Sequence, residues 1–118
     1  MNLNNRSYEF SAPIIPAASP IDGLITTASL NQPLAVEIVL WDGVRAGYSI
    51  QLKLNDFNVG EVKVVSNINE PGDTLLMHLE EQYLMKSGLY HVGFEVTNHI
   101  NQVSEDSPIT PLIVDRTA

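Results

Sequence analysis

The chain has 118 residues, which is the usual length of one domain and enough to bury an independent core. Apolar residues make up 44% of it and charged residues 17%, a balance that indicates a globular chain and excludes a disordered one. Six basic and fourteen acidic residues give a net charge of -8, which argues against nucleic acid as a partner, because binding phosphates needs clustered lysine and arginine.

The absence of cysteine excludes a thiol nucleophile, a cysteine-type zinc site and disulfide bonds. The polar N-terminus at residues 1–5 precedes no apolar run of the length that a signal peptide needs. No stretch approaches the roughly 18 apolar residues of a transmembrane helix, so we expect no membrane insertion. If the protein is exported, the export signal lies on a longer parent chain or the route is unconventional.

Proline dominates the start of the chain. Pro13, Pro16 and Pro20 each fix the backbone angle φ and remove a hydrogen-bond donor. Residues 1–20 are therefore predicted to be an irregular segment that contains one extended edge strand, ahead of a main domain at residues 21–118. The first nine residues carry few apolar groups, and we expect them to pack poorly.

Beyond the first turn, apolar residues recur with a period of two, which is typical of half-buried strands. Strands are predicted at residues 35–40, 48–54, 61–65, 74–79, 90–97 and 109–114, with a turn at residues 55–58 and a loop at residues 69–73. Only residues 80–86 have a pattern that a short helical turn would fit. The side chains on the apolar faces are predicted to form the core: Val36, Ile38, Leu40, Ile50, Leu52, Leu54, Leu75, Met77, Leu79, Val92, Phe94 and Val96.

Seven or eight short strands separated by turn clusters favour an all-β, immunoglobulin-like antiparallel β-sandwich, with a small closed barrel as the alternative. Gly88 precedes Tyr90 by two residues at the start of the predicted strand at residues 90–97. In such sandwiches a tyrosine here turns its hydroxyl back to upstream backbone. We therefore expect the Tyr90 ring in the core beside Val92 and its hydroxyl bonded to backbone at residues 80–88.

Asp-Gly-Val-Arg-Ala-Gly at residues 42–47, the alternating strand that follows it, the run at residues 88–96 and the ending at residues 113–118 carry a resemblance. Residues 21–118 resemble the bacterial immunoglobulin-like domains that repeat in tandem in large secreted or surface proteins. The resemblance implies a non-catalytic structural, spacer or adhesion module at the cell surface or in a secreted protein. Its partners would be neighbouring domains of the same chain, or a host or cell-surface protein or glycan. Only one copy is present here.

No catalytic motif or nucleotide-binding loop occurs, so the sequence predicts neither an enzyme nor a cofactor. Residues 67–72 begin like a calcium loop, but Pro71 occupies its fifth position and His78 its twelfth, which indicates a polar loop. His78 and His91 are expected on outward faces of strands in opposite sheets, and His99 in a turn. This arrangement is poor for a shared metal, and surface histidines are expected.

Two groups of residues motivate an alternative function, a module that binds a glycan or makes a calcium-dependent contact. Trp41, Asp42 and Arg45 belong to one loop, and we expect Trp41 on the face opposite the core, with Tyr48 buried. The second group, Glu80, Glu81, Asp106 and Asp115, would hold calcium only if the fold brought these carboxylates to one end; otherwise they are solvated.

Overall fold

The computed structural model describes residues 10–117. Within this range the chain is mostly β, with eight strands, two 3-10 helices and no α-helix. In chain order the elements are β1 (Leu24–Thr26), η1 (Thr27–Leu30), β2 (Leu34–Val39), β3 (Ser49–Leu54), β4 (Phe57–Val64), β5 (Thr74–Leu79), η2 (Glu81–Leu84), β6 (Gly88–Thr97), β7 (Ser104–Asp106) and β8 (Thr110–Asp115).

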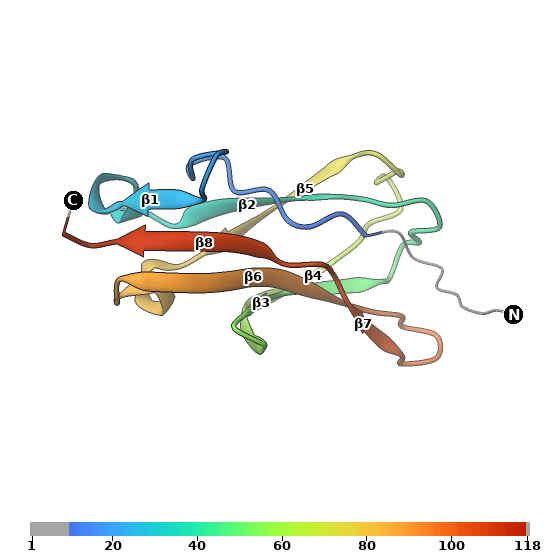
Figure 1. Cartoon of the computed structure of the whole chain (residues 1–118). Coiled ribbons are helices and arrows are strands. Elements are labelled where there is room, and N and C mark those ends of the chain that lie inside the picture. The colour runs from blue at the N-terminus through green and yellow to red at the C-terminus, as the bar shows by residue number, and fades with distance from the viewer. Residues whose placement is uncertain (1–9, 118) are drawn as a thin grey trace, which may run out of the picture.

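The strands form two sheets of unequal width (Figure 1). The wide sheet has the order β1-β8-β6-β3-β4, with β7 also paired to β6, and the narrow sheet contains β2 and β5. The predicted antiparallel arrangement holds for all the described strand pairs except one, since β1 runs parallel to β8 and makes the wide sheet mixed. The chain reaches β8 only after crossing the molecule several times, so no local pattern reveals this pairing.

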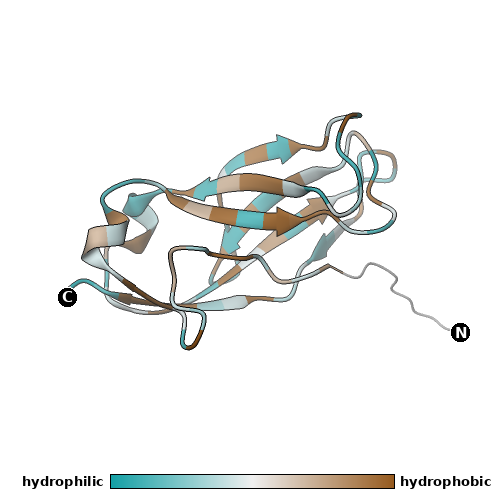
Figure 2. Cartoon of the chain, turned by 90° about the horizontal axis from the view of Figure 1, so that it is seen from above, coloured by the Kyte–Doolittle hydropathy of each residue, from teal (hydrophilic) through white to brown (hydrophobic). Residues whose placement is uncertain are grey.

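Side chains from both sheets meet in one core. All twelve residues predicted for it from the alternating pattern are buried, which confirms the register of β2, β3, β5 and β6. Leu30 of η1, Leu84 of η2 and Leu112 of β8 close the core, each with no exposed surface. Figure 2 shows the alternation of hydrophobic and hydrophilic residues along the strands.

The hairpin between β3 and β4 is tighter than predicted. Asn55 and Asp56 have φ values of 50° and 72°, and two consecutive residues with positive φ make the two-residue turn that suits the twist of paired strands. Phe57 and Asn58, predicted in the turn, already belong to β4. Further along, the register shifts between Gln51 and Leu52, so that β4 carries an irregularity near Gly60.

The last predicted strand, at residues 109–114, forms as β8, and a short strand that was not predicted, β7, precedes it. Ser107 lies between these two strands and is bonded to β6: its hydroxyl accepts a hydrogen bond from the Phe94 N–H at 2.9 Å, and its own N–H donates to the Phe94 carbonyl at 2.8 Å. The same segment lies over Gly93, where a Cβ would come within 3.4 Å of the Ser107 hydroxyl oxygen. Gly93, predicted to face outward, is therefore covered.

The N-terminal segment differs from its prediction. Its extended edge strand reduces to a single bridge between Ile14 and Glu37, although Ile15 is buried against the core. The first regular strand is β1, which no pattern in the sequence predicted. The expectation that residues 1–9 pack poorly falls outside the described residues.

The connection from β5 to β6 agrees with the prediction. The short helical turn forms as η2, and the Tyr90 hydroxyl donates to the Lys86 carbonyl at 2.7 Å. The Tyr90 ring is half-buried and packs against the core. Arg116 fastens the end of β8 to η2, donating to the Leu84 carbonyl at 2.9 Å and to the Glu81 carboxylate at 3.0 Å.

Candidate functional site

Three loops gather at the end of the molecule where the described chain begins: β2–β3, β4–β5 and β6–β7 (Figure 1). Backbone hydrogen bonds join the first two loops. The Leu40 N–H donates to the Asp73 carbonyl at 2.8 Å, and the Gly47 N–H donates to the Val65 carbonyl at 2.9 Å. We call this region the loop end; such loops on a rigid β scaffold are where recognition commonly occurs.

Trp41 does not lie on an outer face, and that expectation is wrong. Its side chain is only 4% exposed, and the Phe10 ring packs edge-on against it with centroids 4.5 Å apart. The strand alternation ends with β2 at Val39, so Leu40 and Trp41 both turn inward. Of the three residues predicted to make contacts from this loop, only Asp42 and Arg45 are exposed.

The indole nitrogen of Trp41 is buried and has no hydrogen-bond partner within the described residues. A buried donor without a partner costs free energy, so Trp41 is held by the packing of its ring and not by its polar atom. A ring in this position closes the core and is not presented to a ligand.

His99 stabilises the loop end through packing. Gly47 has a φ of 97°, and a Cβ there would lie 2.7 Å from two atoms of the His99 imidazole. The Tyr48 ring meets the same imidazole edge-on at 5.8 Å, and the Asn98 amide donates to the Tyr48 hydroxyl at 3.2 Å. Tyr48 is buried, as predicted. The loops at this end are thus fixed in place by contacts with each other.

The structure does not bring the predicted carboxylates together. Glu81 pairs with Arg116 at 3.0 Å, whereas Asp106 pairs with Lys53 at 3.1 Å on another part of the wide sheet. Within residues 10–117 no group of three histidine, aspartate or glutamate side chains is placed to hold a metal ion. These carboxylates therefore provide no common cation site there.

The loop that begins like a calcium site uses its oxygen atoms internally. The Asn69 side chain accepts a bond from the Ser66 N–H at 2.9 Å, and the Asp73 carboxylate accepts one from the Glu70 N–H at 3.0 Å. His78, His91 and His99 are exposed, and the first two lie on strands of different sheets, as predicted. Their positions fit surface histidines.

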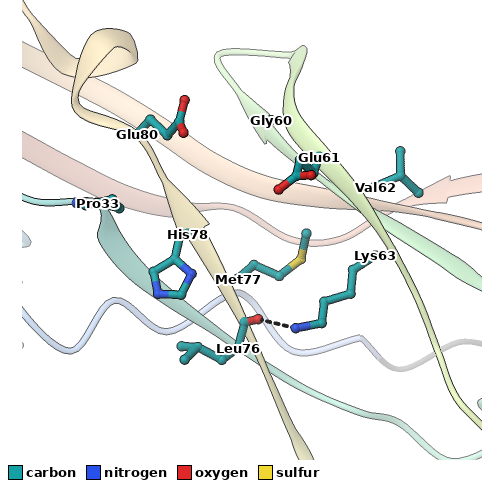
Figure 3. A pocket seen from close by; sticks show the side chains of 9 residues that line it. All are labelled: Pro33, Gly60, Glu61, Val62, Lys63, Leu76, Met77, His78 and Glu80. Carbon is teal, nitrogen blue, oxygen red and sulfur yellow. Dashed lines mark hydrogen bonds between the residues drawn. The ribbon is translucent and has the colours of Figure 1, made fainter.

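A second surface feature was not predicted. A groove of about 550 Å³ opens between β4 and β5, within the range of ligand sites (Figure 3). Its lining residues come from both strands and their flanks: Pro33, Gly60, Glu61, Val62, Lys63, Leu76, Met77, His78 and Glu80. The Lys63 ammonium crosses the groove and donates to the Leu76 carbonyl at 2.9 Å.

Comparison with known proteins adds no relative to this description. No protein-family model matches the chain, and a search of curated proteins finds no significant match. None of the helices among the described residues has the length and apolar character needed to cross a membrane.

Proposed function

We propose that this chain is an immunoglobulin-like, non-catalytic module that serves as a structural spacer or adhesion domain of a larger bacterial protein at the cell surface or in a secreted assembly. Its partners are then neighbouring domains of the same chain, or a host or cell-surface protein or glycan.

Local features favour the immunoglobulin-like assignment. Two sheets pack across one core, and the strands that precede and follow η2 lie in different sheets. The Tyr90 hydroxyl binds the carbonyl four residues upstream, as the tyrosine at this corner does in such sandwiches. The parallel β1–β8 pair closes the edge of the wide sheet where the first and last strands meet.

The path of the chain is the observation that carries the spacer function. Phe10 packs beside Trp41 at the loop end, whereas Arg116 is bonded to η2 at the opposite end of a molecule whose long dimension is 47 Å (Figure 1). A domain entered at one end and left at the other adds its full length to a row of domains. A domain whose two connections lie at the same end would project sideways from the row and add little to its length.

A protein made of two copies in tandem, Ala118 of the first joined to Met1 of the second, tests this function by small-angle X-ray scattering. We expect an elongated particle whose maximum dimension approaches twice that of the single domain. The single domain, measured alone at several concentrations, is the control for self-association.

A tandem protein in which the two domains lie side by side, with little gain in length, would contradict the spacer function. The loop residues provide a matched check, because Arg45→Ala at the loop end removes an exposed charge without touching the core. If the elongation depended on that residue, a contact between copies and not the path of the chain would set the length.

A further inference from the structure

The groove between β4 and β5 lies where two sheet edges face each other. β4 is the last strand of the wide sheet and β5 is one of the two strands of the narrow sheet. Among the described strands, each is paired on one side only, β4 with β3 and β5 with β2. The narrow sheet thus ends at β5 and the wide sheet ends at β4, with the groove between the two edges.

The hydrogen bonds on the far side of β2 show which backbone groups of β5 face the groove. The Glu37 N–H and carbonyl exchange hydrogen bonds with Ile14, so they point away from β5. Glu37 lies opposite Leu76, and in an antiparallel pair such a residue and its partner both direct their backbone groups outward. The N–H and carbonyl of Leu76 therefore face the groove, as do those of Thr74 and His78 two residues to either side.

Lys63 occupies the position of a missing hydrogen-bond donor. It pairs with Ile50, which is fully buried, so its side chain lies on the inner face of the wide sheet. From there its ammonium reaches the Leu76 carbonyl, which the N–H of an added strand would otherwise bind. A lysine on an open edge is a known device against unwanted strand pairing.

The charges around the groove indicate what it accepts. Glu61 of β4 and Glu80 after β5 flank one end from opposite sides, and the Lys63–Leu76 bond lies toward the other end (Figure 3). A second copy would bring another net charge of -8 and the same two glutamates to this edge, which electrostatic repulsion disfavours. A strand with a basic residue at the glutamate end meets no such penalty.

We propose that this groove binds an extended, basic peptide segment, which adds to the free edge of β5 as a third strand and displaces the Lys63 ammonium from the Leu76 carbonyl. Main-chain hydrogen bonds to Thr74, Leu76 and His78 hold the peptide, as in other complexes formed by strand addition. Alternate apolar side chains of the peptide lie beside Met77, and its basic residue lies between Glu61 and Glu80.

The test uses the whole chain and two short blocked peptides that alternate valine and threonine, one with arginine at its amino end and one with arginine at its carboxyl end. Both are needed because the added strand can run in either direction. Amide hydrogen exchange, followed by nuclear magnetic resonance, is the readout. We expect one of the two peptides to slow the exchange of the Thr74, Leu76 and His78 N–H groups, while those of Leu75 and Met77, which already face β2, change little.

Three variants probe the parts of the groove. Lys63→Met keeps an apolar stem but frees the Leu76 carbonyl, and it should bind the peptide more tightly than the parent. Glu61→Gln combined with Glu80→Gln should remove the preference for arginine over glutamate in the peptide, which we expect to be about fivefold in the parent. Glu70→Gln, at an exposed glutamate of the loop end, is the matched charge control and should leave that preference unchanged.

Protection of the Leu76 amide by either peptide, with the order of affinities given above, supports the proposal. Three outcomes overturn it: no protection of Leu76 at the highest soluble peptide concentration, protection confined to other strands, or equal affinity of the parent for the arginine and glutamate peptides. A Lys63→Met protein that binds no peptide but dimerises through β5 would also overturn it, because the occupant would then be a second copy.

Discussion

Tyr90 donates its hydroxyl hydrogen to the Lys86 carbonyl across the turn that leads from η2 into β6. The Tyr90→Phe substitution keeps the half-buried ring and removes this bond. Since one such bond contributes about 0.5–1.5 kcal/mol, we expect the free energy of unfolding to fall by that amount without a change of fold. Urea denaturation followed by circular dichroism measures it.

Tyr83 is the matched control for Tyr90. Its ring also packs against the core, but its hydroxyl makes no hydrogen bond within the described residues. The Tyr83→Phe variant should therefore be as stable as the parent. Equal stability of the Tyr90→Phe variant would show that the corner bond contributes nothing, and would weaken the immunoglobulin-like assignment in favour of a small barrel.

Gly23 is required by both its conformation and its surroundings. Its φ is 75°, and a Cβ there would lie 2.5 Å from the Pro111 carbonyl oxygen, a backbone atom that cannot move aside alone. Gly43 also has a positive φ of 94° but has open space around it. We predict that Gly23→Ala lowers the unfolding free energy by about 1–3 kcal/mol more than Gly43→Ala does, since only the first forces β1 and β8 apart. Thermal denaturation of the two variants distinguishes them, and equal losses would contradict this reading of the contact.

At the scale of elements, Arg116 joins the end of β8 to η2. Its guanidinium binds the Leu84 carbonyl and the Glu81 carboxylate, and its side chain is only 18% exposed. We expect Arg116→Met to reduce the unfolding free energy by about 1–2 kcal/mol, because a carbonyl and a carboxylate both lose a charged donor. The denaturant guanidinium chloride is a salt and would screen the Arg116–Glu81 pair, so urea denaturation is the appropriate measurement.

Two further variants separate the contributions. Glu81→Gln should cost less than Arg116→Met, because the bond to the Leu84 carbonyl remains. Arg45→Met removes an exposed arginine of the loop end and should change stability by less than about 0.5 kcal/mol. If Arg116→Met lowered the unfolding free energy no more than Arg45→Met does, the hydrogen bonds between β8 and η2 would not contribute to stability.

The elements differ in how far the sequence predicts them. β2, β3, β5 and β6 each bury one face, so strict alternation reveals both their positions and their registers. β1 and β7 have three residues each, too few for a period to be seen, and they exist because β8 and β6 offer edges to pair with. The prediction for Trp41 is wrong because it applies the alternation of inward and outward side chains beyond Val39, where β2 ends.

The candidate surfaces also differ in how far the sequence predicts them. Asp42 and Arg45 could be assigned to an exposed loop from the turn residues around them. The groove could not be found in this way, because it depends on the narrow sheet ending at β5 beside an uncovered part of β4. The available sequence signal was weak: Lys63 interrupts a run of valines in the strand predicted at residues 61–65, at a position that pairs with the buried Ile50.

At the scale of the whole molecule, we expect the first and last strands to resist tension applied along the long axis. β1 and β8 run parallel, with Leu24 opposite Ile113 and Thr26 opposite Asp115. Pulling the loop end against the C-terminal end slides these two strands past each other, so their hydrogen bonds are loaded together. Pulling between the β3–β4 turn at Asp56 and the C-terminus would instead peel β8 from one end, loading its bonds one after another.

Single-molecule force spectroscopy compares these two directions in the same protein, and it tests the spacer function most directly. We expect one cooperative unfolding event when the chain is held by its two termini, at a clearly higher force than when it is held at Asp56 and the C-terminus. An unfolding force between the termini equal to or below that of the second geometry would contradict the spacer function, because a spacer must resist tension along the path of its chain.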